Sequence, residues 1–154
     1  GVLSPTAAVQ LNLRHAMTRI GFSFRKANIN TTVIVKTITL SGAISRGVLS
    51  FDENENITWS LNSAYKGSYL ASINNGAINP VSLSTQYTEI TFPDGYLIMI
   101  PQPLAEGQIL LTITYSVNTE EKELQLELPQ GEWIAGRYIN YQITIQNTET
   151  QIYM

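Results

Sequence analysis

The sequence predicts an all-β protein, a β-sandwich of antiparallel strands, and three observations lead to this prediction. Apolar and polar residues alternate with a period of two in several segments, as in half-buried strands. Turn-forming residues recur along the whole chain. The apolar residues lean towards Ile, Val, Leu and Tyr, Thr and Ser are abundant, and no segment shows a convincing amphipathic helix. We therefore expect about ten strands in a single domain, residues 1–154.

The first half of the chain supplies several expected strands. Val9, Leu11 and Leu13 alternate with polar residues, and so do Ile20, Phe22 and Phe24. Residues 32–40 are dense in Val, Ile and Thr, and Ser41-Gly42 follows them as an expected turn. The stretch 52–91 is rich in Asn and Ser with weaker alternation, so we expect short strands in longer loops there.

The second half alternates more clearly. Tyr96–Ile100 is apolar on both faces, which favours a central strand. Residues 109–117 and 123–128 alternate on either side of Asn118–Lys122, which predicts a β-hairpin. The last expected strand begins at Tyr138 and places four apolar side chains on one face: Ile139, Tyr141, Ile143 and Ile145.

Composition excludes several classes of function. Nine Lys and Arg against twelve Asp and Glu give a net charge of −3, and the basic residues form no patch. Binding to nucleic acid, or to a membrane through a basic cluster, is therefore not expected. The chain has no Cys, so disulfides and thiolate sites are excluded. No segment approaches the roughly 20 apolar residues of a transmembrane span. Because the chain starts at Gly1, we expect a processed or trimmed polypeptide.

The titratable residues do not suggest an active site. His15 is the only histidine, and Asp52 and Asp94, the only aspartates, lie in turn contexts, which disfavours a Ser-His-Asp triad and a transition-metal site. Asp52–Asn56 is the densest oxygen cluster but lacks the spacing of a calcium loop, so a solvated hairpin tip is favoured. A further group of carboxylates invites comparison with glycosidase pairs, but a solvent-facing strand explains it more simply: Glu120, Glu121, Glu123 and Glu127. We expect no catalytic residue, metal or cofactor.

Aromatic residues in the middle of the chain offer one binding hypothesis. A sugar-stacking platform could be built from loop aromatics, of which the candidates are Trp59, Tyr65, Tyr69 and Tyr87. The alternative is that these rings cover the ends of the core. Two N-glycosylation patterns, starting at Asn30 and Asn56, are expected by chance in a chain this rich in Asn and Thr.

Four ordered segments resemble the C-terminal domain of the Bacteroidales fimbrillin-like proteins, the subunits of type V pili. The first is the alternating strand with His-Ala-Met-Thr-Arg-Ile at Val9–Ile20. The second is the Val-rich strand with Gly42 and then Gly47-Val48-Leu49. The third is the apolar strand ending in Ile100-Pro101-Gln102. The fourth is the closing turn and strand, with Trp133, Gly136, Tyr138, Tyr141, Ile143 and Ile145.

The resemblance implies a fold and a function. It implies a transthyretin-like or Greek-key β-sandwich that is the C-terminal domain of a two-domain lipoprotein, exported to the cell surface. It also implies a non-enzymatic fimbrial or adhesin subunit that binds other subunits by strand addition after proteolytic trimming, and that has a host or microbial surface ligand. Since the chain ends at Met154, soon after the last strand, we expect a shortened chain or a tip or anchor component. The alternative is a surface carbohydrate-binding module; a small hydrolase is disfavoured.

Overall fold

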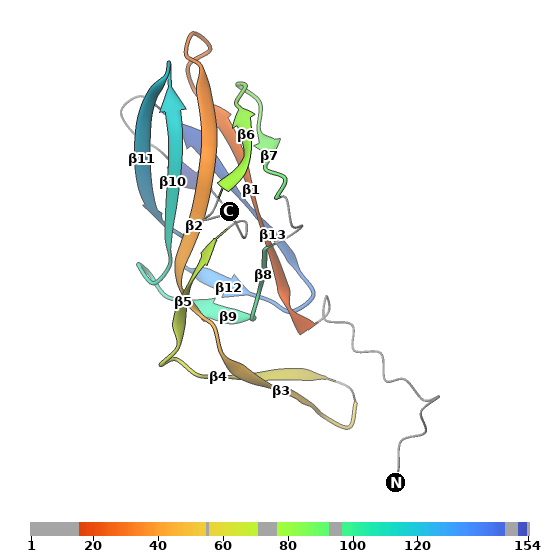
Figure 1. Cartoon of the computed structure of the whole chain (residues 1–154). Coiled ribbons are helices and arrows are strands. Elements are labelled where there is room, and N and C mark those ends of the chain that lie inside the picture. Colours follow the sequence, from red (N-terminus) through yellow and green to blue (C-terminus); the bar gives the residue numbers. More distant parts are fainter. Residues whose placement is uncertain (1–15, 55, 71–76, 93–96, 147–150, 154) are drawn as a thin grey trace.

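The structure, a computed structural model, describes residues 16–54, 56–70, 77–92, 97–146 and 151–153. Within these ranges, fourteen strands form two five-stranded sheets and two two-stranded ones (Figure 1). The prediction of an all-β protein is confirmed. The strand number exceeds the expected one because several strands, such as β7 and β9, are only two or three residues long.

The first sheet is built around two long neighbouring strands, β1 and β13. Its order is β14-β13-β1-β7, and β8 also pairs with β1. Its strands are β1 (Thr18–Lys26), β7 (Thr88–Glu89), β8 (Leu97–Met99), β13 (Tyr138–Ile145) and β14 (Gln151–Tyr153). β1 and β13 run parallel, with Phe22 opposite Tyr141. This departs from the expected antiparallel pairing, and it is possible because the two strands are far apart in sequence and need no hairpin turn.

The second sheet has the order β11-β10-β2-β5, and β6 also pairs with β2. Its strands are β2 (Val33–Ile44), β5 (Lys66–Leu70), β6 (Ala77–Ser82), β10 (Leu110–Val117) and β11 (Glu120–Glu127). All its pairings are antiparallel. The expected hairpin is present, but its turn is only Asn118-Thr119, so Glu120 and Glu121 lie in β11 rather than in the turn.

Two small pairs complete the fold. β9 (Gln102–Leu104) pairs with β12 (Gly131–Trp133), and β3 (Gly47–Phe51) pairs with β4 (Ile57–Leu61). The β3–β4 hairpin projects from the lower end of the sandwich in Figure 1. The expected short strands within 52–91 are confirmed, because β4 to β7 lie there.

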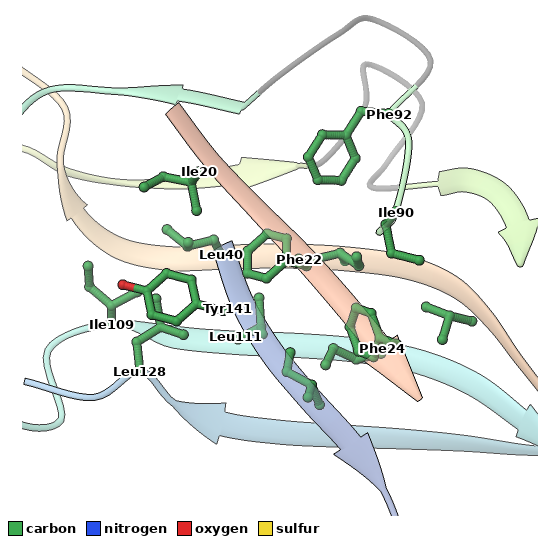
Figure 2. Packing of buried hydrophobic residues seen from close by; sticks show 14 of the residues in the cluster. Ile20, Phe22, Phe24, Leu40, Ile90, Phe92, Ile109, Leu111, Leu128 and Tyr141 are labelled. Carbon is green, nitrogen blue, oxygen red and sulfur yellow. The ribbon is translucent and has the colours of Figure 1, made fainter. Parts of the chain in front are cut away.

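The core lies between the two large sheets. Phe22 and Phe24 of β1 and Tyr141 of β13 are fully buried, and so is Leu111 of β10 (Figure 2). The apolar face expected for the strand at Tyr138 is confirmed in β13: Tyr141, Ile143 and Ile145 are buried and Ile139 packs against the core. Period-two patterning therefore predicted the inward faces of these strands correctly. The expectation that the strand at Tyr138 is the last one is wrong, because β14 follows it and pairs with it.

Two other expectations about strands are wrong. The segment around Ile98 is not a central strand: β8 is three residues long, pairs only with β1 among the described strands, and leaves Ile98 48% exposed. Gly42 does not end a strand but lies inside β2, where the pairing with β5 shifts register between Ser41 and Ala43. The expected strand at Val9–Leu13 lies outside the described residues.

Candidate functional site

An open groove lies at the end of the sandwich where β1 begins. It has a volume of about 520 Å³, and Met17, Ile98 and Ile100 contribute much of its apolar wall. On the side of the β3–β4 hairpin it is lined by Arg46 and Trp59. Because so much of the lining is apolar and open to water, the groove is a candidate interaction surface.

The position of β8 explains why Ile98 reaches this groove. β8 pairs antiparallel with β1, with Thr18 opposite Met99 and Arg19 opposite Ile98. Met99 is buried in the core, so its neighbour Ile98 points to the opposite face of the strand. A β-branched side chain is thus held half-exposed on a short strand whose other edge is unpaired among the described strands.

The start of β1 is fastened to the turn before β13. The backbone N–H of Gly136, at a φ of 77°, donates to the Met17 carbonyl over 2.9 Å. The hydroxyl of Thr18 donates to the Ile134 carbonyl over 2.8 Å. A left-handed φ favours glycine at this position. One wall of the groove is therefore fixed by the turn that precedes β13.

Trp59 is fixed by a polar contact. Its indole N–H donates to the Ala16 carbonyl over 2.7 Å, which ties β4 to the segment that leads into β1. Nearby, the Arg46 guanidinium lies 4.0 Å from the centre of the Tyr65 ring, within the range of a cation–π contact. Trp59 and Tyr65, two of the aromatic candidates, therefore both lie close to Arg46 at this end of the molecule.

Tyr87 lies apart from the groove. Its hydroxyl hydrogen-bonds the Thr144 hydroxyl at 3.0 Å, and the Arg25 guanidinium lies 4.6 Å from the ring centre. Arg25 is six residues along β1 from Arg19, the partner of Ile98, which corresponds to about 20 Å of strand. The structure thus separates Tyr87 from Trp59 and Tyr65. The side chain of Tyr69 lies outside the described residues.

The Asp52–Asn56 cluster forms the tip of the β3–β4 hairpin. One oxygen of Asp52 accepts from the backbone N–H of Asn54 and Asn56, each over 2.8 Å, and the other accepts from the Asn56 side chain over 2.7 Å. The Asn56 side-chain bond, followed by the backbone bonds, holds the pKa of Asp52 below its ordinary value. The carboxylate therefore stabilises its own turn. Glu55 lies outside the described residues.

The acidic side chains of β11 line a strand at the edge of the second sheet. Glu120, Glu123 and Glu127 are exposed, and Glu121 pairs with Lys36 of β2. Across the described ranges, no three His, Cys, Asp or Glu side chains gather as metal ligands would. His15 and Asp94 lie outside the described residues. The same ranges contain no helix long and apolar enough to cross a membrane.

The β3–β4 hairpin has an apolar face that was not predicted from the sequence. In this antiparallel pair, Leu49 lies opposite Trp59 and Phe51 lies opposite Ile57, so these four side chains share one face. Phe51 is 52% exposed. The signal was present as two short alternations, Gly47-x-Leu49-x-Phe51 and Ile57-x-Trp59-x-Leu61.

These features describe a β-sandwich that exposes apolar side chains around an open groove at one end. A model of the fimbrillin-like family matches residues 1–154. The chain therefore belongs to the fimbrillin-like family. A comparison with curated proteins finds no match.

Solved structures share the fold. A fimbrial protein from Bacteroides vulgatus aligns with a TM-score of 0.60 and 15% identity, over 90% of this chain and 53% of that one. A proposed cell adhesion protein from Bacteroides fragilis aligns with a TM-score of 0.52 and 19% identity, over 90% of this chain and 45% of that one. The chain thus spans about half the length of the solved structures that it matches.

Proposed function

We propose that this chain is a domain of a non-enzymatic, cell-surface fimbrial or adhesion subunit. Family membership supports the proposal, and so do the fimbrial and adhesion roles attached to the two similar structures. The chain spans about half of those proteins, which supports one domain of a two-domain protein. From the resemblance of its four ordered segments, we take residues 1–154 as the C-terminal domain of an exported lipoprotein. Its partners are other fimbrial subunits and a ligand on a host or microbial surface.

Assembly by strand addition is supported by the unpaired outer edge of β8 beside the groove. Among the described strands, only β1 pairs with β8. The opposite edge of β8 can therefore pair with a strand of another subunit. Strand addition gains affinity from main-chain hydrogen bonds and specificity from side chains that enter a pocket at alternate positions. Ile98, Met17 and Trp59 supply the apolar surface for such side chains.

The edge of the second sheet is less suited to that role. β11 carries exposed carboxylates along its length, including Glu120, Glu123 and Glu127. Charged side chains on an edge strand oppose pairing with another strand, because the incoming strand must approach or desolvate them. We therefore place strand addition at β8 and not at β11.

The test is assembly of the full-length protein that carries this domain. Purified protein is treated with a trypsin-like protease and examined by size-exclusion chromatography and electron microscopy. The proposal predicts oligomers or filaments after proteolysis. A protein that remains monomeric at every concentration would remove the role of shaft subunit.

A carbohydrate-binding module is a second candidate, favoured by Trp59 and Arg46 on the wall of one open groove. An aromatic face beside a guanidinium can stack against a sugar ring and hydrogen-bond its hydroxyls. A glycan array probed with the unmodified chain and with Trp59→Ala tests this reading. Specific binding that Trp59→Ala abolishes would support it, and no binding at millimolar sugar would remove it.

A further inference from the structure

The groove beside β8 combines apolar walls with a single charge. Of the residues that line it, only Arg46 is charged, whereas Met17, Ile98 and Ile100 are apolar. A guanidinium next to apolar surface attracts a carboxylate more strongly once a ligand covers both groups, because less water screens the two charges. The lining therefore favours a ligand that carries apolar side chains and a negative charge.

The Arg46 side chain is held at the edge of the groove. Its guanidinium lies 4.0 Å from the centre of the Tyr65 ring, in a cation–π contact. The backbone is fixed on both sides: the Ser45 N–H donates to the Tyr65 carbonyl over 2.9 Å, and the Asn62 N–H donates to the Arg46 carbonyl over 2.9 Å. A side chain that is already ordered loses less conformational entropy when a ligand binds.

The charge of Arg46 is not neutralised within the described part of the chain. Among those residues, no carboxylate lies within ion-pair distance of Arg46, and the ion pair that forms joins Lys36 of β2 to Glu121 of β11. The Tyr65 ring attracts the cation but leaves its charge in place. The planar fork of guanidinium N–H donors matches the two oxygens of a carboxylate. The ligand can therefore supply the negative charge.

The place of Arg46 along β8 gives the order of groups in such a ligand. The Gln102 side chain bonds both the N–H and the carbonyl of Ile44, over 2.8 and 3.1 Å. Arg46 follows Ile44 by two residues and so lies towards the Ile100 end of β8. Ile98 and Ile100 both line the groove and are about 7 Å apart on one face of the strand. A strand added to β8 therefore passes Ile98, then Ile100, and then meets Arg46.

We propose that the strand that adds to β8 comes from another subunit and carries two apolar residues at alternate positions, followed by an acidic residue at the next alternate position. The apolar side chains pack against Ile98 and Ile100, and the carboxylate accepts hydrogen bonds from Arg46. This inference rests on the proposed function, because it names the chemistry of the partner strand. Arg46 also rejects strands that place a cation there, since like charges would then meet.

Calorimetric titration of chain 1–154 with capped peptides tests this specificity. Each peptide has about seven residues, with Thr at the odd positions and Val, Val and Glu at the even ones, and is made in both directions of sequence. Companion peptides carry Gln or Lys in place of Glu. We expect the Glu peptide to bind roughly tenfold more tightly than the Gln peptide, and the Lys peptide to bind most weakly. The difference should shrink in about 1 M salt.

Charge reversal on the protein is the second arm of the test. Arg46→Glu should make the Lys peptide the tightest binder, and Arg46→Gln, the milder variant, should bind the Glu and Gln peptides equally. Lys122→Glu is the matched control, because it makes the same charge change on an exposed residue of β11 and should keep the original order. Ile98→Ser should weaken all three peptides.

The outcomes separate this inference from the proposed function. Equal affinity of the unmodified chain for the Glu and Gln peptides would overturn the inference and leave strand addition standing. Failure of every peptide to bind would remove strand addition at β8, and the inference with it. Binding that Ile98→Ser leaves unchanged would show a site elsewhere and would also overturn the inference. Dimers of the unmodified chain that Ile98→Ser dissociates would assign the groove to a folded second copy instead.

Discussion

At the scale of single residues, the positions that mark the family form the scaffold. The indole N–H of Trp133 donates to the Tyr141 hydroxyl over 2.9 Å, and both side chains are buried. The Tyr141 ring stacks on Phe22, with centroids 6.0 Å apart. Gln102, in the Ile-Pro-Gln segment, is buried and exchanges two hydrogen bonds with the backbone of Ile44. These residues therefore join strands that are distant in the sequence.

The hydroxyl of Tyr141 contributes to the free energy of unfolding through its hydrogen bond with Trp133, and this contribution changes at high pH, where the hydroxyl ionises. We expect Tyr141→Phe to lower the free energy of unfolding by about 1–3 kcal/mol, because it leaves a buried indole N–H without its acceptor. Urea titration at neutral pH measures this loss. Trp133→Phe, which removes the donor instead, is the companion variant for a double-mutant cycle. A neutral Tyr141→Phe would contradict the role of the hydrogen bond.

Burial raises the pKa of Tyr141 above its ordinary value of 10.0, and the Trp133 hydrogen bond opposes this only in part. The stability that this pKa difference contributes is therefore fully present below pH 10 and is lost as pH rises from there through the folded-state pKa. We expect unfolding free energy to fall above about pH 10, with a smaller slope in Tyr141→Phe. Burial raises the pKa of Tyr115 as well, so some slope remains. Equal slopes would contradict this account.

Gly42 allows β2 to bend at its register shift. Its φ is 94°, and an added Cβ would lie 2.1 Å from the Gln108 carbonyl oxygen, a backbone atom. We expect Gly42→Ala to lower the unfolding free energy by about 3 kcal/mol, from the left-handed conformation and the clash. Gly107→Ala is the control, because its φ is 70° but its nearest contact would be 3.7 Å. Thermal unfolding of both variants gives the comparison, and equal losses would refute the clash.

At the scale of elements, the turn between β10 and β11 joins the sandwich to the β1–β2 connection. Asn118 and Thr119 both have positive φ, 49° and 75°. The Asn118 side chain accepts from the backbone N–H of Thr32, and its own backbone N–H donates to the Thr32 carbonyl, each over 2.9 Å. Asn suits the first turn position, whereas a β-branched Thr is strained at the second.

Thr119→Gly should therefore stabilise the protein. Removing the β-branched side chain relieves the left-handed strain, and we expect a net gain of about 0.5–1 kcal/mol after the entropic cost of glycine. Thr58→Gly, in the middle of β4, is the control and should destabilise. Chemical denaturation measures both. A loss of stability in Thr119→Gly would show that the turn is not strained.

Strand alternation was predictable where one face is buried and the other is not, as in β1, β10 and β13. The same logic failed for β8, which was expected to be a central strand with both faces buried, because Ile98 lines an open groove instead of packing into a core. The parallel pairing of β1 with β13 was beyond prediction, because no turn residue records the register of strands more than a hundred residues apart. The role of Gly42 was misread because a glycine that serves a bulge looks locally like one that serves a turn.

At the scale of the whole molecule, apolar surface gathers at one end of the sandwich. The groove brings β8 and the β3–β4 hairpin together through Met17, Ile98 and Trp59. The sequence pointed to loops and edges rather than to a pocket. It singled out Trp59 as a candidate stacking residue but not Met17 or Ile98, because the proximity of the three depends on connections between distant elements. The alternation of apolar and polar residues within the β3–β4 hairpin was, by contrast, visible in the sequence.

The most direct test of the account is assembly of the full-length protein with Ile98→Lys, followed by size-exclusion chromatography and electron microscopy after trypsin-like proteolysis. Ile29→Lys is the matched control, since Ile29 is 72% exposed and follows the other end of β1. The account predicts that Ile98→Lys abolishes assembly while Ile29→Lys assembles like the unmodified protein. Normal assembly of folded Ile98→Lys protein would contradict it.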